Sequence, residues 1–179
     1  AIDGKTSRGS FDNQLQKGAI HLVNAWISSN RLVLGQLKTR EKSNEITAIP
    51  ELLDLLFVKD CIITIDAMGC QREIAEKIID KKADYVLAEK GNHPNLLKDI
   101  VDWFDFAEEN NFKDFEFDAY KTMDKGHGRI ETRKYYITED IEWLAGKSDW
   151  KGLKSIGMVI RENYENNKAT TERRYYICS

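Results

Sequence analysis

The sequence predicts an α/β fold in which a mixed sheet carries helices on its faces and a β-rich segment follows. Three observations support this prediction. Residues 21–27 and 32–39 are strand-like and are separated by a short polar turn, as in an antiparallel hairpin. The apolar residues 61–65 and 85–88 alternate with helix-like segments, as in parallel strand–helix–strand units. After residue 105 the apolar residues recur at strand spacing.

The first half of the chain begins with a short strand at residues 2–3, which extends the hairpin into an antiparallel meander. A helix follows, in which apolar residues recur at helical spacing: Ile46, Ile49, Leu52, Leu53 and Leu56. Pro50 is tolerated in a helix only near its start, so we expect the helix to begin close to it. Residues 61–65 form a continuous apolar run, as expected of a strand buried on both faces.

Two more helices are expected on either side of the strand at residues 85–88. The first carries one apolar stripe, made of Ile74, Ala75, Ile78 and Ile79. The second follows the turn at residues 91–94 and has its own stripe: Leu96, Leu97, Ile100, Val101 and Phe104.

The second half is expected to be mainly β-structure. Four segments read as strands separated by turns rich in glycine and asparagine: residues 115–120, 129–137, 155–161 and 173–178. Between them, residues 141–144 and 150–153 are expected to supply aromatic anchors, with Trp143 and Trp150 packed in the core or at an interface. The sequence therefore predicts a core over residues 1–104 and a β-rich insertion or extension over residues 105–179.

Composition limits the class of protein. The chain has 179 residues, 41% of them hydrophobic and 32% charged, which is ordinary for a globular protein of one domain. No apolar run approaches the roughly 20 residues that span a bilayer, so we expect a cytoplasmic protein without a membrane partner. The formal net charge of −3 argues against a surface that is basic throughout, but permits a local basic face. Three cysteines without CxxC spacing support neither a disulfide framework nor a zinc ribbon.

Asp3 and Asp66 are the strongest candidates for chemistry. Each follows an apolar stretch and precedes a glycine within three residues, which is typical of a carboxylate presented at the carboxyl edge of a sheet. Two neighbouring carboxylates can hold Mg²⁺ or Mn²⁺, ions that prefer oxygen ligands and catalyse displacement at phosphorus. The alternative is that each aspartate caps a turn, with Asp66 capping the helix near Gln71.

Five segments, in order along the chain, resemble the successive motifs of bacterial insertion-sequence DDE transposases, in the branch that includes the H-repeat-associated proteins. They are residues 1–6, 42–46, 64–71, 83–92 and 126–133. The resemblance implies a ribonuclease-H-like core with a β-rich insertion. It also implies Mg²⁺-dependent cleavage of double-stranded DNA at transposon ends and strand transfer into target DNA by the freed 3′-hydroxyl.

Within this resemblance, Asp3 matches the first catalytic acid and Asp66 the second. The third is a glutamate in a helix beyond the insertion, in a stretch that this chain does not contain. We therefore expect a fragment of the catalytic core with poor turnover on its own. Glu131 is a weak local substitute, expected to sit between Arg129 and Arg133 in an ion-pair ladder on one face of a strand. Glu89 is a second substitute by position.

Several basic residues are candidates for DNA contacts. Lys5 and Arg8 follow Asp3 in a segment that resembles a phosphate-binding loop in composition but lacks its spacing. Lys90 follows the strand next to the one that ends at Asp66. A further group is expected to form a basic, aromatic β-surface that alternation divides between two faces: His127, Arg129, Arg133, Lys134, Tyr135, Arg173, Arg174 and Tyr175.

Three alternatives to a transposase core remain open at this point. A structure-selective nuclease of the same fold would cleave DNA without joining strands. A catalytically inactive element remnant would bind DNA or a partner without chemistry. A nucleotide-binding regulator is poorly supported, because no glycine-rich fingerprint opens a helix after a strand. A homodimer of the full-length protein is an option that the sequence leaves open, as it does the DNA sequence recognised.

Overall fold

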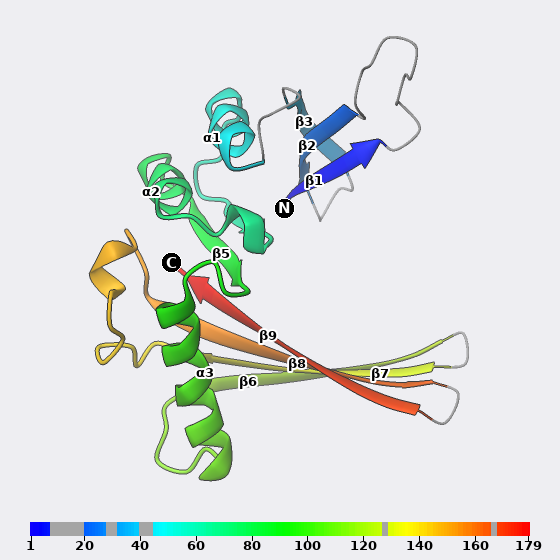
Figure 1. Ribbon diagram of the computed structural model, residues 1–179, viewed down its shortest axis with the longest axis vertical. Coiled ribbons are helices and arrows are strands. Elements are labelled where there is room, and N and C mark those ends of the chain that lie inside the picture. The colour runs from blue at the N-terminus through cyan, green and yellow to red at the C-terminus, as the bar shows by residue number, and fades with distance from the viewer. Residues whose placement is uncertain (8–19, 28–31, 40–44, 127–128, 166–167) are drawn as a thin grey trace. The chain divides into compact units, whose positions relative to one another are not determined.

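The computed structural model describes residues 1–7, 20–27, 32–39, 45–126, 129–165 and 168–179 (Figure 1). The chain divides into two compact units, Ala1–Leu87 and Ala88–Ser179. Within the described ranges, no helix is both long enough and apolar enough to cross a membrane.

The first unit is built on a mixed sheet. Its elements are β1 (Ile2–Ser7), β2 (Ile20–Ile27), β3 (Leu32–Lys38), α1 (Glu45–Leu55), β4 (Ile62–Ile65), the 3-10 turn η2 (Ala67–Gly69), α2 (Arg72–Asp80) and β5 (Asp84–Glu89). The strands lie in the order β3-β2-β1-β4-β5. β2 is antiparallel to both β1 and β3, whereas β4 is parallel to both β1 and β5. This order confirms the antiparallel meander followed by strand–helix–strand units, and with it the ribonuclease-H-like mixed sheet.

The core of the first unit comes from the apolar stripes of its helices and from alternate strand residues. The fully buried side chains include Ile49, Leu52, Leu53, Ile74, Ile78, Tyr85 and Leu87. The expectation that the fourth strand is buried on both faces is wrong. Ile63 and Ile65 are each 5% exposed, but Ile62 is 67% exposed. Pro50 also lies inside α1 and not at its start.

The second unit is an antiparallel sheet with one long helix. Its elements are α3 (Pro94–Glu109), β6 (Asp118–Gly126), β7 (Arg129–Thr138), the 3-10 turn η3 (Lys147–Asp149), β8 (Ser155–Glu165) and β9 (Lys168–Cys178). The strands lie in the order β9-β8-β7-β6, each antiparallel to its neighbours, and Figure 1 shows them running together as a long ribbon. This arrangement confirms a β-rich second half.

One face of this sheet is buried against α3. The Phe104 ring, fully buried, lies 6.3 Å from the Tyr175 ring on β9. Arg173, two residues earlier on the same face, donates to Asp105 on the helix at 2.8 Å. Because side chains alternate along a strand, Arg174 and Tyr176 lie on the face that points away from α3. Four residues of the expected anchor segments are buried: Ile141, Leu144, Trp150 and Leu153. Trp143, however, is 41% exposed.

The expected bounds of several elements in the second half are wrong. The structure places β6 at Asp118–Gly126, not at residues 115–120. Phe115 instead contacts Trp103 and Phe106 edge-on, so its apolar side chain belongs to the packing after α3 and not to a strand. The third helix continues past Phe104 to Glu109. β8 and β9 extend beyond the predicted segments, because polar residues continue the hydrogen-bonded ladder between them.

Candidate catalytic acids and the arginine face

Asp3 and Asp66 lie on neighbouring strands. β1 and β4 run parallel with Ile2 opposite Ile65, and the two aspartates are the next residue along each chain. Ile2 and Ile65 are buried at 6% and 5% exposure, whereas both aspartates are exposed. Because side chains alternate along a strand, the Asp3 carboxylate points to the side opposite Ile2, whereas Asp66 lies just beyond the end of β4 and is oriented by its cap of η2. The register therefore places the two acids at adjacent positions on neighbouring strands, where both are exposed.

The two acids differ in their local structure. Asp66 directly follows β4 and caps η2, with Oδ1 accepting from the Met68 N–H at 3.3 Å. Asp66 therefore caps the 3-10 turn η2 and not α2, the helix near Gln71 that it was expected to cap. Asp3 lies near the beginning of β1 and not at its carboxyl end, because the strand continues through Ser7. A capping bond occupies one carboxylate oxygen and orients the side chain, which leaves the capping and metal-binding interpretations of Asp66 compatible.

Glu131, the substitute for the third acid, is held by two guanidinium groups. Its Oε2 accepts from Nε of Arg161 at 2.8 Å and also from Nη2 of the same residue, and its Oε1 lies 2.6 Å from Nη2 of Arg133. The hydrogen bond from Arg161 lowers the pKa of Glu131, with Arg133 and Arg161 adding to the effect by charge. The ladder partner predicted to be Arg129 is thus Arg161, from the adjacent strand β8. These bonds make Glu131 a structural carboxylate of the second unit.

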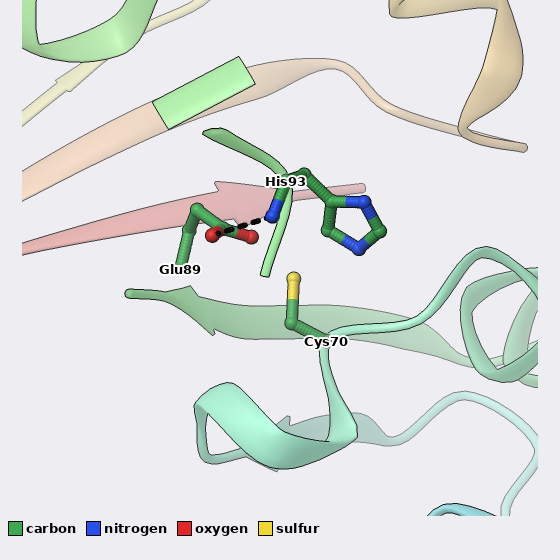
Figure 2. Close-up of side chains that lie close together, drawn as sticks. All are labelled: Cys70, Glu89 and His93. Carbon is green, nitrogen blue, oxygen red and sulfur yellow. Dashed lines mark hydrogen bonds between the residues drawn. The ribbon is translucent and has the colours of Figure 1, made fainter. Parts of the chain in front are cut away.

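Glu89 also has a structural role. Glu89 is 2% exposed, and its Oε1 accepts from the N–H of Gly91 at 2.6 Å. The same oxygen accepts from the N–H of His93 at 3.2 Å (Figure 2). These bonds close the turn before α3, where Gly91 adopts φ +107°. The His93 ring packs edge-on against Trp150, with ring centroids 4.9 Å apart. Cys70, also drawn in Figure 2, is a buried residue of the first unit.

The predicted DNA-contacting residues fall into different surroundings. Lys5 lies in the strand β1 and not in a loop, and it is exposed. It comes two residues after Asp3, so both side chains lie on the same side of the strand. Lys90 is exposed directly after β5, and Arg129 is exposed at the start of β7. Arg8 and His127 lie outside the described residues.

The basic β-surface is divided between two faces, as alternation predicts. Arg173 faces α3, where it bonds Asp105 and Glu108 at 2.8 Å each. Arg133 and Arg174 lie on the opposite face of the sheet, which they share with Arg161 and Tyr176. We call this surface the arginine face: Arg133, Tyr135, Val159, Arg161, Arg174 and Tyr176. Arg161 was not predicted, because it joins this surface only through the register of β8 against β7. Tyr176 was not predicted either, although alternation along β9 places it on the same face as Arg174.

The chain was compared with known proteins. The family model described as "Transposase DDE domain" matches residues 1–176. YncI of Escherichia coli O157:H7, named as a transposase candidate, is 49% identical over 183 residues, or 100% of this chain and 46% of that protein. YhhI of Escherichia coli K12, named as an H repeat-associated transposase candidate, is 45% identical over 186 residues, or 100% of this chain and 48% of that protein. The chain thus spans about half the length of the curated relatives it matches.

Among solved structures, a chain from the cryo-EM structure of the piggyBac transposase synaptic complex with hairpin DNA aligns with a TM-score of 0.44. The two sequences are 10% identical, and the alignment covers 99% of this chain and 32% of the other. So distant a likeness supports no conclusion about this chain.

Proposed function

This chain belongs to the transposase DDE domain family, and we propose that Asp3 and Asp66 are two of the acids of a metal-dependent DNA-cleaving centre. The observation that carries the proposal is the register of β1 against β4, in which Ile2 is opposite Ile65 and the aspartates come next. Two exposed carboxylates on adjacent parallel strands are a donor set that fits a hard divalent cation.

The two carboxylates would hold Mg²⁺ or Mn²⁺ through their oxygens. Such an ion, when bound, stabilises the charge on the attacking and leaving oxygens of a displacement at phosphorus. Asp66 is oriented for this role by its bond from the Met68 N–H, and Asp3 by its place in the β1 ladder. Lys5, on the same side of β1 as Asp3, would pair with a phosphate of the DNA.

We propose that the third acid belongs to a part of the protein outside these 179 residues. Glu131 is bonded to two arginines, and Glu89 is bonded to two backbone N–H groups of its own turn. Both carboxylates therefore already have structural partners. In the full-length protein the complete centre would cleave double-stranded DNA at transposon ends and join the freed 3′-hydroxyl to target DNA.

The test is cleavage of a plasmid that carries the element's own ends, in Mg²⁺ or Mn²⁺, by the full-length protein. Asp3→Asn and Asp66→Asn should each reduce cleavage by at least about a hundredfold, because each removes a charged ligand from the reacting centre. Calorimetric titration with Mn²⁺ gives a second readout and should show weaker binding in both variants. The matched control is Asp60→Asn, an exposed aspartate of the first unit in a turn with φ +60°, a conformation that asparagine adopts readily.

Cleavage at the parent rate in both aspartate variants would refute the proposal. Cleavage without joined products in the parent protein would indicate the structure-selective nuclease instead. Absence of cleavage in a parent protein that still binds DNA would indicate the inactive remnant.

A further inference from the structure

A hollow of about 170 Å³ lies on the arginine face, between side chains of β7, β8 and β9. The register brings its residues into rows across the strands. Arg133 is opposite Arg161, and in the next row Tyr135, Val159 and Arg174 are aligned. Three guanidinium groups therefore converge on one hollow from three adjacent strands.

The charges around the hollow do not cancel. Glu131 is bonded to both Arg133 and Arg161. Glu172 accepts from Nε of Arg174 at 2.8 Å and lies 4.0 Å from Nη1 of Arg161. Three arginines thus share two carboxylates, which leaves one positive charge in the cluster.

The hollow also retains unused donors. A guanidinium carries five N–H groups, and the contacts to Glu131 and Glu172 use only some of them. The Tyr135 and Tyr176 side chains line the same hollow as Arg133 and Arg174. A phenol can donate its own proton to a further acceptor. The arginines are therefore held in place while donors remain for a ligand.

We propose that this hollow binds one phosphodiester group of the DNA backbone. The proposal rests on the proposed function, which makes DNA the partner, and adds a surface of this chain that meets it. A phosphodiester carries one negative charge, equal to the surplus in the cluster, and its two free oxygens match the bidentate geometry of arginine. Lys90 contributes to the field around Glu172, so a further exposed cation lies within electrostatic reach of the hollow.

The test compares two neighbouring arginines on opposite faces of β9 in the 179-residue chain. Arg174→Ala removes a guanidinium from the hollow, whereas Arg173→Ala removes the same charge from the face that packs on α3. Binding of a short labelled duplex of mixed sequence is measured by fluorescence anisotropy over a range of salt concentrations. Circular dichroism shows whether each variant is folded.

In Arg174→Ala the dissociation constant at low salt should rise about tenfold, as expected for the loss of a hydrogen-bonded charge contact. The slope of log K against log salt should become shallower by about 0.9, because one phosphate contact is lost. Arg173→Ala should keep the parent slope. Tyr176→Phe keeps the ring and removes a hydroxyl donor from the hollow, so it should weaken binding in the same direction and serves as the second variant if Arg174→Ala does not fold.

Equal effects of Arg173→Ala and Arg174→Ala would overturn the inference, because they would show a response to net charge alone. So would an unchanged slope in Arg174→Ala, an unchanged dissociation constant in Tyr176→Phe, or failure of the parent chain to bind DNA. A single-stranded probe of the same length distinguishes a phosphodiester of duplex DNA from one of single-stranded DNA. Each contact to duplex DNA contributes about 0.9 to the slope, whereas each contact to single-stranded DNA contributes about 0.7. The assay needs no cleavage, so failure of the catalytic proposal leaves this result readable.

Discussion

Gly69 fixes the turn that presents Asp66. A Cβ added at this position would lie 2.3 Å from Cγ2 of Ile65 and 2.9 Å from Cδ1 of Ile49, so atoms of the core would have to move. Gly69→Ala should therefore lower the free energy of unfolding by about 1–3 kcal/mol, as overpacked cores do. Urea unfolding followed by circular dichroism measures this difference.

Gly126 on β6 provides the control for that measurement, because a Cβ added there would meet nothing within 4 Å. Gly126→Ala should change stability by no more than about 0.5 kcal/mol. Equal stability of the two alanine variants would mean that the turn at Gly69 is looser than the structure indicates.

Glu131 links stability to pH. Its pKa is lowered from the ordinary 4.5, chiefly by the hydrogen bond from Arg161, so the folded chain binds fewer protons there than the unfolded chain does. The resulting stabilisation is present at neutral pH and is lost as pH falls through the lowered folded pKa. Glu131→Gln should therefore be less stable than the parent at neutral pH and should lose less stability on acidification below about 4.5.

Urea unfolding at a series of pH values measures both effects. Glu142→Gln is the control, because Glu142 is 87% exposed and its ion pair with Lys147 should contribute little. A Glu131→Gln curve that stays parallel to the parent curve at every pH would contradict the expected role of the arginine pair.

At the scale of elements, α3 shows how one helix face stabilises a sheet. Phe104 is fully buried on the side that packs against Tyr175, whereas Phe106 is 58% exposed. Phe104→Ala should cost about 3–5 kcal/mol of unfolding free energy, as expected for a large aromatic residue removed from a core. The same change at Phe106 should cost much less. Chemical unfolding of the two variants side by side checks this, and equal losses would contradict the assigned helix face.

Helices with a strong apolar stripe were predictable from the sequence. α2 and α3 lie where the spacing of Ile74, Ile78, Leu96 and Ile100 predicts them. β6 was misplaced because Phe115 looks like a strand residue but packs against Trp103. The limits of β8 and β9 were too short because backbone pairing continues where apolar content stops.

The candidate sites also divide into one that the sequence indicates and one that it does not. The aspartates could be proposed from the sequence, since each lies beside an apolar strand segment, and the structure adds the register that Ile2 and Ile65 mark. The arginine face could not be found, because its rows depend on which residues of three strands stand opposite one another. Arg161 joins Arg133 only through the pairing of β7 with β8. Local sequence patterns contain no such information.

At the scale of the whole molecule, the chain spans about half the length of its relatives and offers two proposed catalytic acids. We expect the 179-residue chain to bind DNA but to cleave it at least about a hundredfold more slowly than the full-length protein, because the third acid that we propose for the metal centre would lie outside it. A gel assay of both proteins on the same plasmid measures the ratio. Equal rates would place the third acid within these residues.

The pairing of Ile2 with Ile65 has a consequence for how genes of this family decay. Adding or deleting a single codon next to Asp3 would turn that side chain toward the interior while leaving the apolar composition of β1 almost unchanged. Such an allele would still encode a protein with ordinary hydrophobicity and recognisable motifs, yet its two acids would face away from each other. A search for the motifs alone would classify this allele as intact. The changed spacing between Asp3 and Ile2 would identify the added or deleted codon.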